Sequence, residues 1–232
     1  MRSAKAVFIK QLRDTFKNRM MLVQFIIFPI MAMIMTELVA KADSEIPDTI
    51  FVTMFAAVFV GMTPLSMTNT AIAEDREHKS LRFLVMAGVK PYEYLAGVGG
   101  LVLLICALVS VVFGLIGGFV GMQLVYFVAV LILGSIASTL LGATIGMLSK
   151  NQQAATAIGT PVFMTLSFLP MIAQFNETVE KVASVLYTQQ VNILVHDFSM
   201  NSTKPFLIIM ANIVILIALF ALAYQKKGLK NG

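Results

Sequence analysis

The stretch EDREHKSLRFLVMAGVKPYEYL, residues 74–95, is the longest run of charge in the middle of an otherwise apolar chain. Apolar runs long enough to cross a membrane flank it on both sides. Each ionised side chain costs roughly 3 kcal/mol at the centre of a bilayer, so this stretch must lie in water at one membrane face. Its charged residues are Glu74, Asp75, Arg76, Glu77, Lys79, Arg82, Lys90 and Glu93.

Within this stretch, residues 76–86 are expected to form a short helix, with Leu81 and Leu84 on its apolar face. Gly88 and Pro91 then end it. A short amphipathic helix between two spans is suited to insert into a groove on another protein. The alternative is a solvated loop of mixed charge. We interpret the stretch as the segment that a soluble partner binds in order to move the membrane domain.

The composition points to one membrane domain over residues 1–232. The chain is 58% hydrophobic and 12% charged, whereas a soluble domain carries about 25% charged residues. The net charge is +5. It does not indicate a nucleic-acid partner, because most of the basic residues lie in segments predicted on one side of the membrane. The single cysteine, Cys106, excludes a disulfide framework or a cysteine metal cluster within the chain.

Six spans are predicted, which makes the fold class an all-α membrane protein. A helix of about 20 residues covers the roughly 30 Å of hydrocarbon. The predicted spans are residues 20–40, 49–73, 96–121, 122–148, 154–173 and 205–224.

Residues 1–19 are expected to form a helix that lies in the headgroup plane. On a helical wheel, one apolar stripe contains Ala4, Phe8, Ile9, Leu12 and Phe16, and the opposite side carries Lys10, Arg13 and Lys17. An apolar stripe facing a basic face is typical of an interfacial helix. The alternative is a solvated basic extension of the first span.

The distribution of basic residues predicts the orientation. With six spans, both termini and residues 74–95 share one side, which collects fourteen of the 17 Lys and Arg residues. The other side has only Lys41, Lys181 and Lys204. Because cytoplasmic loops are enriched in Lys and Arg, we expect a multi-pass protein of the cell membrane with both termini in the cytoplasm.

Two features of the spans leave alternatives open. The second span contains Thr63, Ser66, Asn69 and Thr70, which could line a path or simply hydrogen-bond to neighbouring helices. The fourth span has small residues at every fourth position, namely Gly134, Ser138, Gly142 and Gly146. Such a ladder lets another helix approach closely, either within the chain or across a dimer face.

Residues 174–204 are too polar to span and lie on the outer side in this topology. They divide into two short pieces with the spacing of half-buried helices. The first piece offers Val182 and Leu186, and the second offers Val191 and Leu194. A pair of interfacial or partly re-entrant helices fits this pattern better than a loose loop.

The motifs of common enzymes and nucleotide-binding sites are absent from the sequence. There is no GxxxxGK[ST] loop, no HExxH, no CxxC and no GxSxG. His78 and His196 are predicted on opposite sides of the membrane and cannot share a metal. We therefore expect no catalytic residue, no metal and no ATP bound by this chain.

At this point the chain resembles the permease subunits of type-2 ABC exporters, the ABC-2 family. That family has an interfacial N-terminal helix, six spans and a coupling helix with a pattern similar to E-R-E-x-G-T-L-E-x-L. The matching positions here are Arg76, Glu77, Lys79, Ser80, Leu81, Arg82 and Leu84, with Lys79-Ser80 in place of Gly-Thr. Ser167-Phe168-Leu169-Pro170 is similar to the run that precedes the family's short outer gate helices.

The resemblance implies that two permeases pair, as a homodimer or with a sister subunit, and that separate ABC ATPase subunits bind ATP and Mg²⁺ below them. It implies ATPase coupling by Glu74, Asp75, Arg76, Glu77, Lys79, Leu81, Arg82 and Leu84. The implied substrate path contains Thr63, Ser66, Asn69, Thr70, Thr156, Thr160 and Thr165. The implied outer gate contains Pro170, Val182, Leu186 and Leu194.

The implied function is ATP-driven export, with no enzymatic activity in this chain. A path lined by hydroxyls, Met and Phe, with almost no charge, favours an amphipathic or lipophilic cargo. The compact chain is similar in this respect to permeases that export antimicrobial or cytolytic peptides, or drugs. The alternatives are a non-transporting membrane protein, such as an immunity or sensor partner, and an intramembrane enzyme.

Overall fold

Every regular element is helical in the part of the chain that the computed structural model describes, residues 2–42, 46–197 and 203–228. The elements are α1 (Arg2–Lys17), α2 (Arg19–Met35), the π-helix η1 (Thr36–Ala40), α3 (Ile50–Glu77), α4 (Ser80–Met86), α5 (Pro91–Ile116), α6 (Met122–Leu148), α7 (Gln152–Ala173), α8 (Glu177–Ala183), α9 (Tyr187–His196) and α10 (Thr203–Gly228). Within these described ranges, six helices are long and apolar enough to cross a membrane. The predicted all-α fold with six spans is therefore confirmed.

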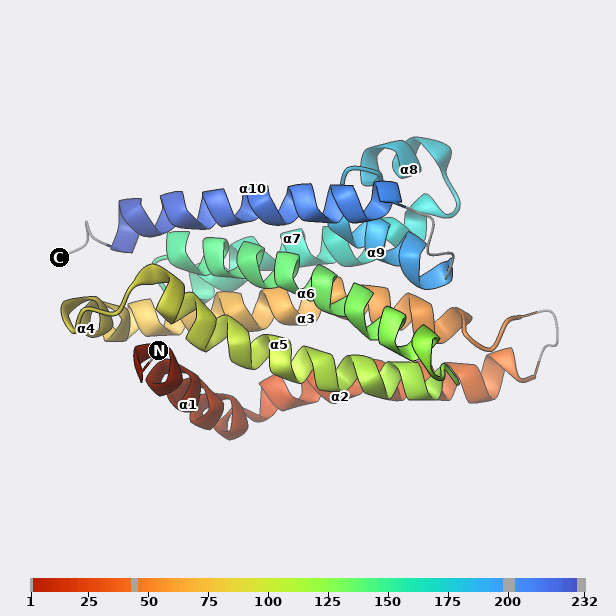
Figure 1. The fold of residues 1–232 in the computed structure, drawn as a ribbon, viewed down its shortest axis with the longest axis horizontal. Coiled ribbons are helices and arrows are strands. Elements are labelled where there is room, and N and C mark those ends of the chain that lie inside the picture. The colour runs from red at the N-terminus through yellow and green to blue at the C-terminus, as the bar shows by residue number, and fades with distance from the viewer. Residues whose placement is uncertain (1, 43–45, 198–202, 229–232) are drawn as a thin grey trace.

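The six long helices run side by side as an elongated bundle (Figure 1). The short helix α4, with α1 and the last turns of α10, lies at one end, which we call the α4 end. Helices α8 and α9 lie toward the opposite end, the α8 end. Residues 74–95 and residues 174–197 are thus separated by the length of the bundle. Within the predicted outer segment 174–204, residues 198–202 lie outside the described residues.

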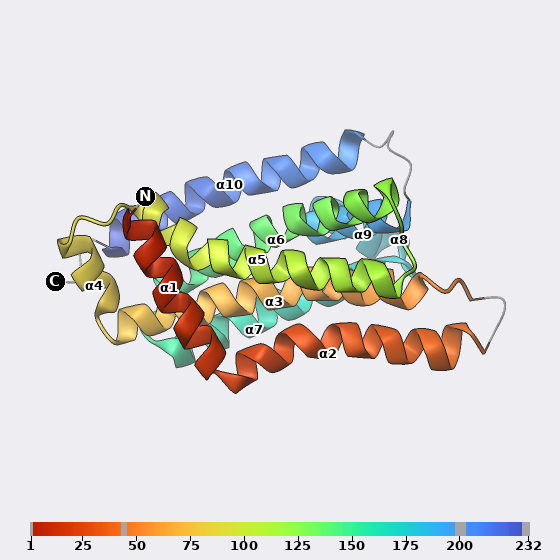
Figure 2. The same cartoon turned by 60° about the horizontal axis from the view of Figure 1, so that its bottom comes forward.

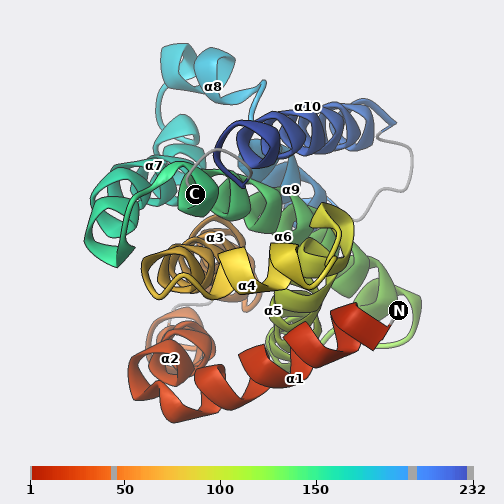
Figure 3. The same ribbon diagram turned by 90° about the vertical axis from the view of Figure 1, so that its left-hand side faces the viewer.

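Helix α3 is the axis of the bundle. It packs against α2, α5, α6, α7 and α9, and the view along the bundle places it among them (Figure 3). Its Phe59 ring is fully buried, with its centroid 5.7 Å from that of Phe113 on α5. A span surrounded by protein can carry polar side chains that lipid would not tolerate, which accounts for the many hydroxyls on this helix.

The small-residue ladder of α6 packs within the chain. A Cβ added to Gly142 would lie 2.3 Å from the carbonyl oxygen of Leu65 on α3, and one added to Gly146 would lie 2.7 Å from that of Asn69. Ser138 Oγ donates a hydrogen bond to the carbonyl of Val60, also on α3, over 2.5 Å. The interpretation of the ladder as an intrachain helix contact is confirmed, and its interpretation as a dimer face is wrong.

Helix α1 lies obliquely across the α4 end instead of continuing the direction of α2 (Figure 2). It packs against α5, where Gly97 leaves room for the Val7 side chain. Only part of the predicted apolar stripe packs against the bundle, because Ile9 and Phe16 are 41% and 64% exposed. The buried face also contains Gln11 and Thr15, which do not belong to the predicted stripe.

The predicted boundaries of the second and third spans differ from the structure. Helix α3 continues through the first charges of the 74–95 stretch to Glu77, and α5 begins at Pro91 instead of residue 96. Proline is favoured in the first turn of a helix, where its missing N–H leaves no bond unmade. Helix α5 ends at Ile116 instead of residue 121, because Gly118 and Gly121 adopt positive φ angles of 69° and 59° in the turn to α6.

The close approach of α3 and α6 predicts a strong effect of one methyl group. Gly142→Ala would place Cβ against the α3 backbone, and we expect it to lower the free energy of unfolding in detergent micelles by about 1–3 kcal/mol. The matched control is Gly100→Ala on α5, where Cβ would meet only Phe8, at 4.0 Å. Equal stability of the two variants would contradict the packing described here.

Candidate functional site

The last turn of α3 buries a carboxylate that holds two other helices. The Asp75 side chain is 3% exposed and forms an ion pair with Lys10 of α1. Its second oxygen accepts a hydrogen bond from the Tyr94 hydroxyl of α5 over 2.9 Å. A buried charge is tolerated only when it is paired and hydrogen-bonded. Asp75 therefore ties α1 and α5 to the end of α3.

The next two residues bind two further helices. The Arg76 guanidinium donates to the carbonyls of Met147 and Ser149, where α6 ends and its last carbonyls lack helical partners. The Glu77 carboxylate accepts from the backbone N–H of Gln152 at the start of α7, over 3.0 Å, where a negative charge is favoured by the helix dipole. We call Asp75, Arg76 and Glu77 the α3 hub, because together they bond to α1, α5, α6 and α7.

The prediction that residue 76 begins the short helix is wrong, because the α3 hub belongs to α3 and α4 starts at Ser80. Lys79 makes the break between the two helices, with a left-handed φ of 60°. The sequence reading treated every charge in the stretch as a mark of the water phase. Asp75 is buried and Arg76 is half-buried, and both bond to groups of the helical bundle instead.

Helix α4 has one face against the bundle and one face in the open. Leu81 is buried in a cluster with Tyr94 and Tyr224, and Leu84 packs against that cluster. Arg82 is exposed, and the exposed fractions of Phe83 and Met86 are 69% and 74%. Phe83 and Met86 were missed from the sequence, although their spacing of three places them on one face of a helix. Of the remaining predicted coupling residues, Glu74 is half-buried and Lys79 is exposed.

The polar residues in the middle of α3 face different neighbours. Asn69 Nδ2 donates to the carbonyl of Ala155 on α7 over 2.8 Å, and Thr63 is fully buried. Ser66 Oγ donates to Gln24 Oε1 of α2 over 3.0 Å, and Thr70 Oγ1 donates to the Ser66 carbonyl. Asn69 thus holds α7 and Ser66 holds α2, the two helices that flank α3 in Figure 3.

The threonines of α7 predicted for the same path are more open. Thr156 and Thr165 are exposed and Thr160 is half-buried. Thr165 Oγ1 donates to the Pro161 carbonyl one turn earlier, which is a common bond for a hydroxyl in a span. Ser66 and Thr70 are half-buried, whereas Thr63 and Asn69 lie in the contacts of α3 with its neighbours.

At the α8 end, α9 is inserted into the bundle. Leu194 and Val195 are fully buried in the main core, and the Tyr187 hydroxyl donates to Ser138 Oγ of α6 over 2.7 Å. Burial raises the pKa of the Tyr187 hydroxyl, so it stays neutral. The prediction of two half-buried helices is wrong in detail, because most of α9 is buried, while Val182 of α8 is 62% exposed. Of the other predicted gate residues, Pro170 is buried and Leu186 is half-buried.

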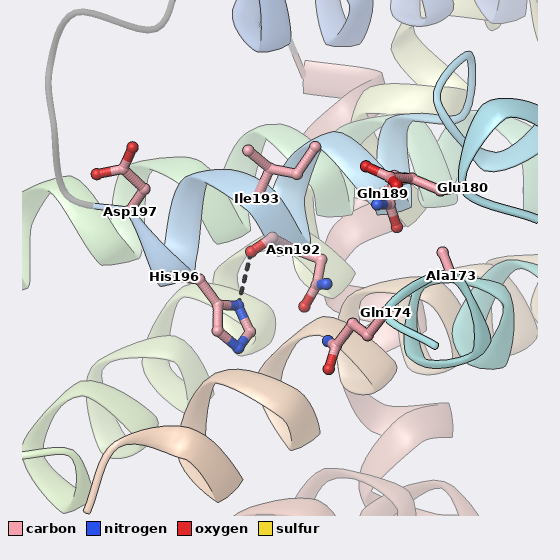
Figure 4. Close-up of a pocket in the computed structure, with 8 residues that line it drawn as sticks. All are labelled: Ala173, Gln174, Glu180, Gln189, Asn192, Ile193, His196 and Asp197. Carbon is pink, nitrogen blue, oxygen red and sulfur yellow. Dashed lines mark hydrogen bonds between the residues drawn. The ribbon is translucent and has the colours of Figure 1, made fainter. Parts of the chain in front are cut away.

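Helices α8 and α9 and the end of α7 line an open pocket of about 440 Å³, which we call the α9 pocket (Figure 4). It is lined by Ala173, Gln174, Glu180, Gln189, Asn192, Ile193, His196 and Asp197. The His196 ring bonds through Nδ1 to the Asn192 carbonyl over 2.8 Å, and its Nε2 lies 3.1 Å from Thr53 Oγ1 of α3. The polar residues of α9 were missed because the sequence analysis used only its apolar positions.

Among the described residues, no three or more His, Cys, Asp or Glu side chains lie close enough to hold a metal ion.

A family model described as an ABC-2 family transporter protein matches residues 34–224. The match begins near the end of α2 and ends in α10, so it includes the α3 hub, α4 and the α9 pocket. No curated protein matches the chain.

The Lys10–Asp75 pair predicts that α1 is held to the bundle by a charge. In Asp75→Asn the amide can still accept from Tyr94, but the attraction to Lys10 is lost. We expect hydrogen exchange of the α1 amides to rise about fivefold or more, which corresponds to a loss of about 1–3 kcal/mol for a hydrogen bond between charged groups.

The matched control is Glu74→Gln, which removes the neighbouring, half-buried carboxylate and should leave the exchange of α1 unchanged. Equal protection of α1 in the Asp75→Asn variant and the unchanged protein would contradict the role given to Asp75.

Proposed function

The chain belongs to the ABC-2 family of transporters, and on that premise we propose that it is the permease subunit of an ATP-driven exporter. The observation that carries this proposal is the open face of α4, where Arg82, Phe83 and Met86 stand exposed at the end of a membrane bundle. The sequence contains no P-loop of its own. The energy would therefore come from a separate ABC ATPase, with its own ATP and Mg²⁺.

The ATPase would bind α4 by taking Phe83 and Met86 into a groove. Short helices with apolar anchors at such spacing are recognised in this way. Beside α4, the α3 hub bonds to four other helices, so a displacement of α4 and the end of α3 would be passed to α1, α5, α6 and α7 together. In this proposal Asp75, Arg76 and Glu77 transmit the movement, and α4 receives it.

The orientation proposed is that the α4 end faces the cytoplasm of the cell. The positive-inside rule supports it, because the basic residues of the chain are concentrated in the segments at this end. Both termini would then be cytoplasmic. Helix α1, with Ile9 and Phe16 exposed, would lie at the inner membrane surface.

The cargo proposed is amphipathic or lipophilic, such as an antimicrobial peptide or a drug. Ser66 and Thr70 of α3, with Thr156, Thr160 and Thr165 of α7, offer hydroxyls beside apolar side chains. Thr63 and Asn69 would join this path only when α3 and α7 separate, since Asn69 now bonds to Ala155. A path bounded by α3 and α7 of one chain would be closed by a second permease, either a copy or a sister subunit.

The cargo would leave at the α8 end, where α9 fills the space between the long helices. Leu194 fixes α9 in the core, and the Tyr187–Ser138 bond joins it to α6. Movement of α6 at the α3 hub would therefore reach α9 through a continuous helix. Pro170, Val182 and Leu186 would shape the segment that moves with it.

The test of the permease role is ATP-dependent transport of a fluorescent amphipathic peptide by proteoliposomes that contain the chain and its co-purifying ATPase. Transport that needs both proteins and ATP is the expected result. If the chain neither recruits an ATPase nor changes its ATP hydrolysis, a non-transporting membrane protein, such as an immunity or sensor partner, becomes the better account.

The docking of α4 predicts the effect of one substitution. Phe83→Asp places a charge where an apolar anchor should be buried, and burial of a Phe side chain contributes about 1.5–3 kcal/mol. We expect recovery of the ATPase with the tagged chain to fall at least about tenfold, measured by quantitative pull-down.

The matched control is Phe175→Asp at the α8 end, where the side chain is 87% exposed. This variant should recover as much ATPase as the unchanged chain. Full recovery of the ATPase by the Phe83→Asp variant would contradict docking through α4.

A further inference from the structure

We propose that the α9 pocket is a binding site for an organic cation, an amine or guanidinium group that reaches it from the α8 end. Its volume of about 440 Å³ falls in the range of small-ligand sites, about 300–1,000 Å³. Three segments build it, the end of α7 and the helices α8 and α9. Figure 4 shows polar side chains from all three segments around it.

The amide of Gln189 is a buried polar group of the site. Its side chain is 5% exposed, and its Oε1 has no hydrogen-bond partner among the described residues. A buried acceptor without a partner is costly, so such groups are rare in folded proteins. Gln189 lines the pocket, and a ligand that donates a hydrogen bond there would satisfy its oxygen.

The charge of the lining selects the sign of the ligand. Glu180 of α8 brings a carboxylate to the pocket, and no Lys or Arg is among the residues that line it. His196 is the one basic lining residue, and both of its ring nitrogens already have partners in Asn192 and Thr53. An anion would meet a like charge here, whereas a cation would meet an opposite one.

The available groups also select the kind of cation. The lining offers amide and carboxylate oxygens from Gln174, Gln189, Asn192 and Glu180. Ammonium and guanidinium groups carry several N–H donors and no acceptor, so they match such a lining. The absence of a metal-ligand cluster among the described residues favours an organic cation over a metal ion.

The test uses the purified full-length chain in lipid nanodiscs and a matched pair of probes. Butylguanidinium and butylurea have the same shape, but only the first is charged. Isothermal titration should give saturable binding of butylguanidinium and at least about tenfold weaker binding of butylurea, because hydrogen bonds to charged groups are about twice as strong as neutral ones. Equal binding of both probes, or no saturable binding of butylguanidinium, would overturn the proposal.

Two substitutions assign the binding to the pocket. Gln189→Met keeps the length of the side chain and removes the buried acceptor, so we expect about tenfold weaker binding and an unfolding temperature that is unchanged or higher. Glu180→Gln should weaken binding about threefold, since an exposed charge contributes modestly. Glu177→Gln removes the other carboxylate of α8, which lies outside the lining, and should change nothing. Unchanged binding by the Gln189→Met variant would overturn the assignment.

The cation has two sources, a group on an exported cargo or a molecule from outside, and transport separates them. Proteoliposomes with the chain and its ATPase would be loaded with both radiolabelled butylguanidinium and ATP. Release of the label assigns the pocket to cargo, which rests on the proposed export function. Saturable binding without release assigns it to an external ligand. The titration itself needs no ATPase, so its failure would leave the permease proposal standing.

Discussion

A carboxylate inside a membrane bundle must be paired, and the Lys10–Asp75 ion pair meets that constraint at the end of α3. Because Asp75 is paired, α3 can continue through the charged stretch to Glu77 instead of ending at the edge of the apolar run. That extension brings Arg76 to the end of α6 and Glu77 to the start of α7. The α3 hub and the transverse position of α1 both follow from this one pair.

Much of the fold could be predicted from the sequence, because hydropathy over about 20 residues is a strong signal. The fourth span matches α6 at both ends, and the two short helices of the 174–204 segment are present. The errors lie where a distant residue decides the outcome. Lys10 is 65 positions from Asp75, so no local pattern reveals that this charge is neutralised inside the bundle.

The candidate site was predicted less well, for a related reason. Local pattern identified α4 and its buried Leu81, and it could have identified the exposed Phe83 and Met86. It did not reveal that the polar residues of α9, including Gln189 and Asn192, are buried. An amphipathic pattern implies water on the polar side, whereas α9 is packed among α3, α6, α7 and α10. Small residues of α6 allow the close packing with α3 that supports this arrangement.

In the proposed permease, the α4 end, with the α3 hub, faces the compartment that supplies ATP. The most direct measurement is labelling of intact cells with a membrane-impermeant maleimide, using single-cysteine variants in a Cys106→Ala background. Glu177→Cys at the α8 end should be labelled at once, and Lys79→Cys, between α3 and α4, only after the membrane is permeabilised. Labelling of Lys79→Cys in intact cells would contradict the account.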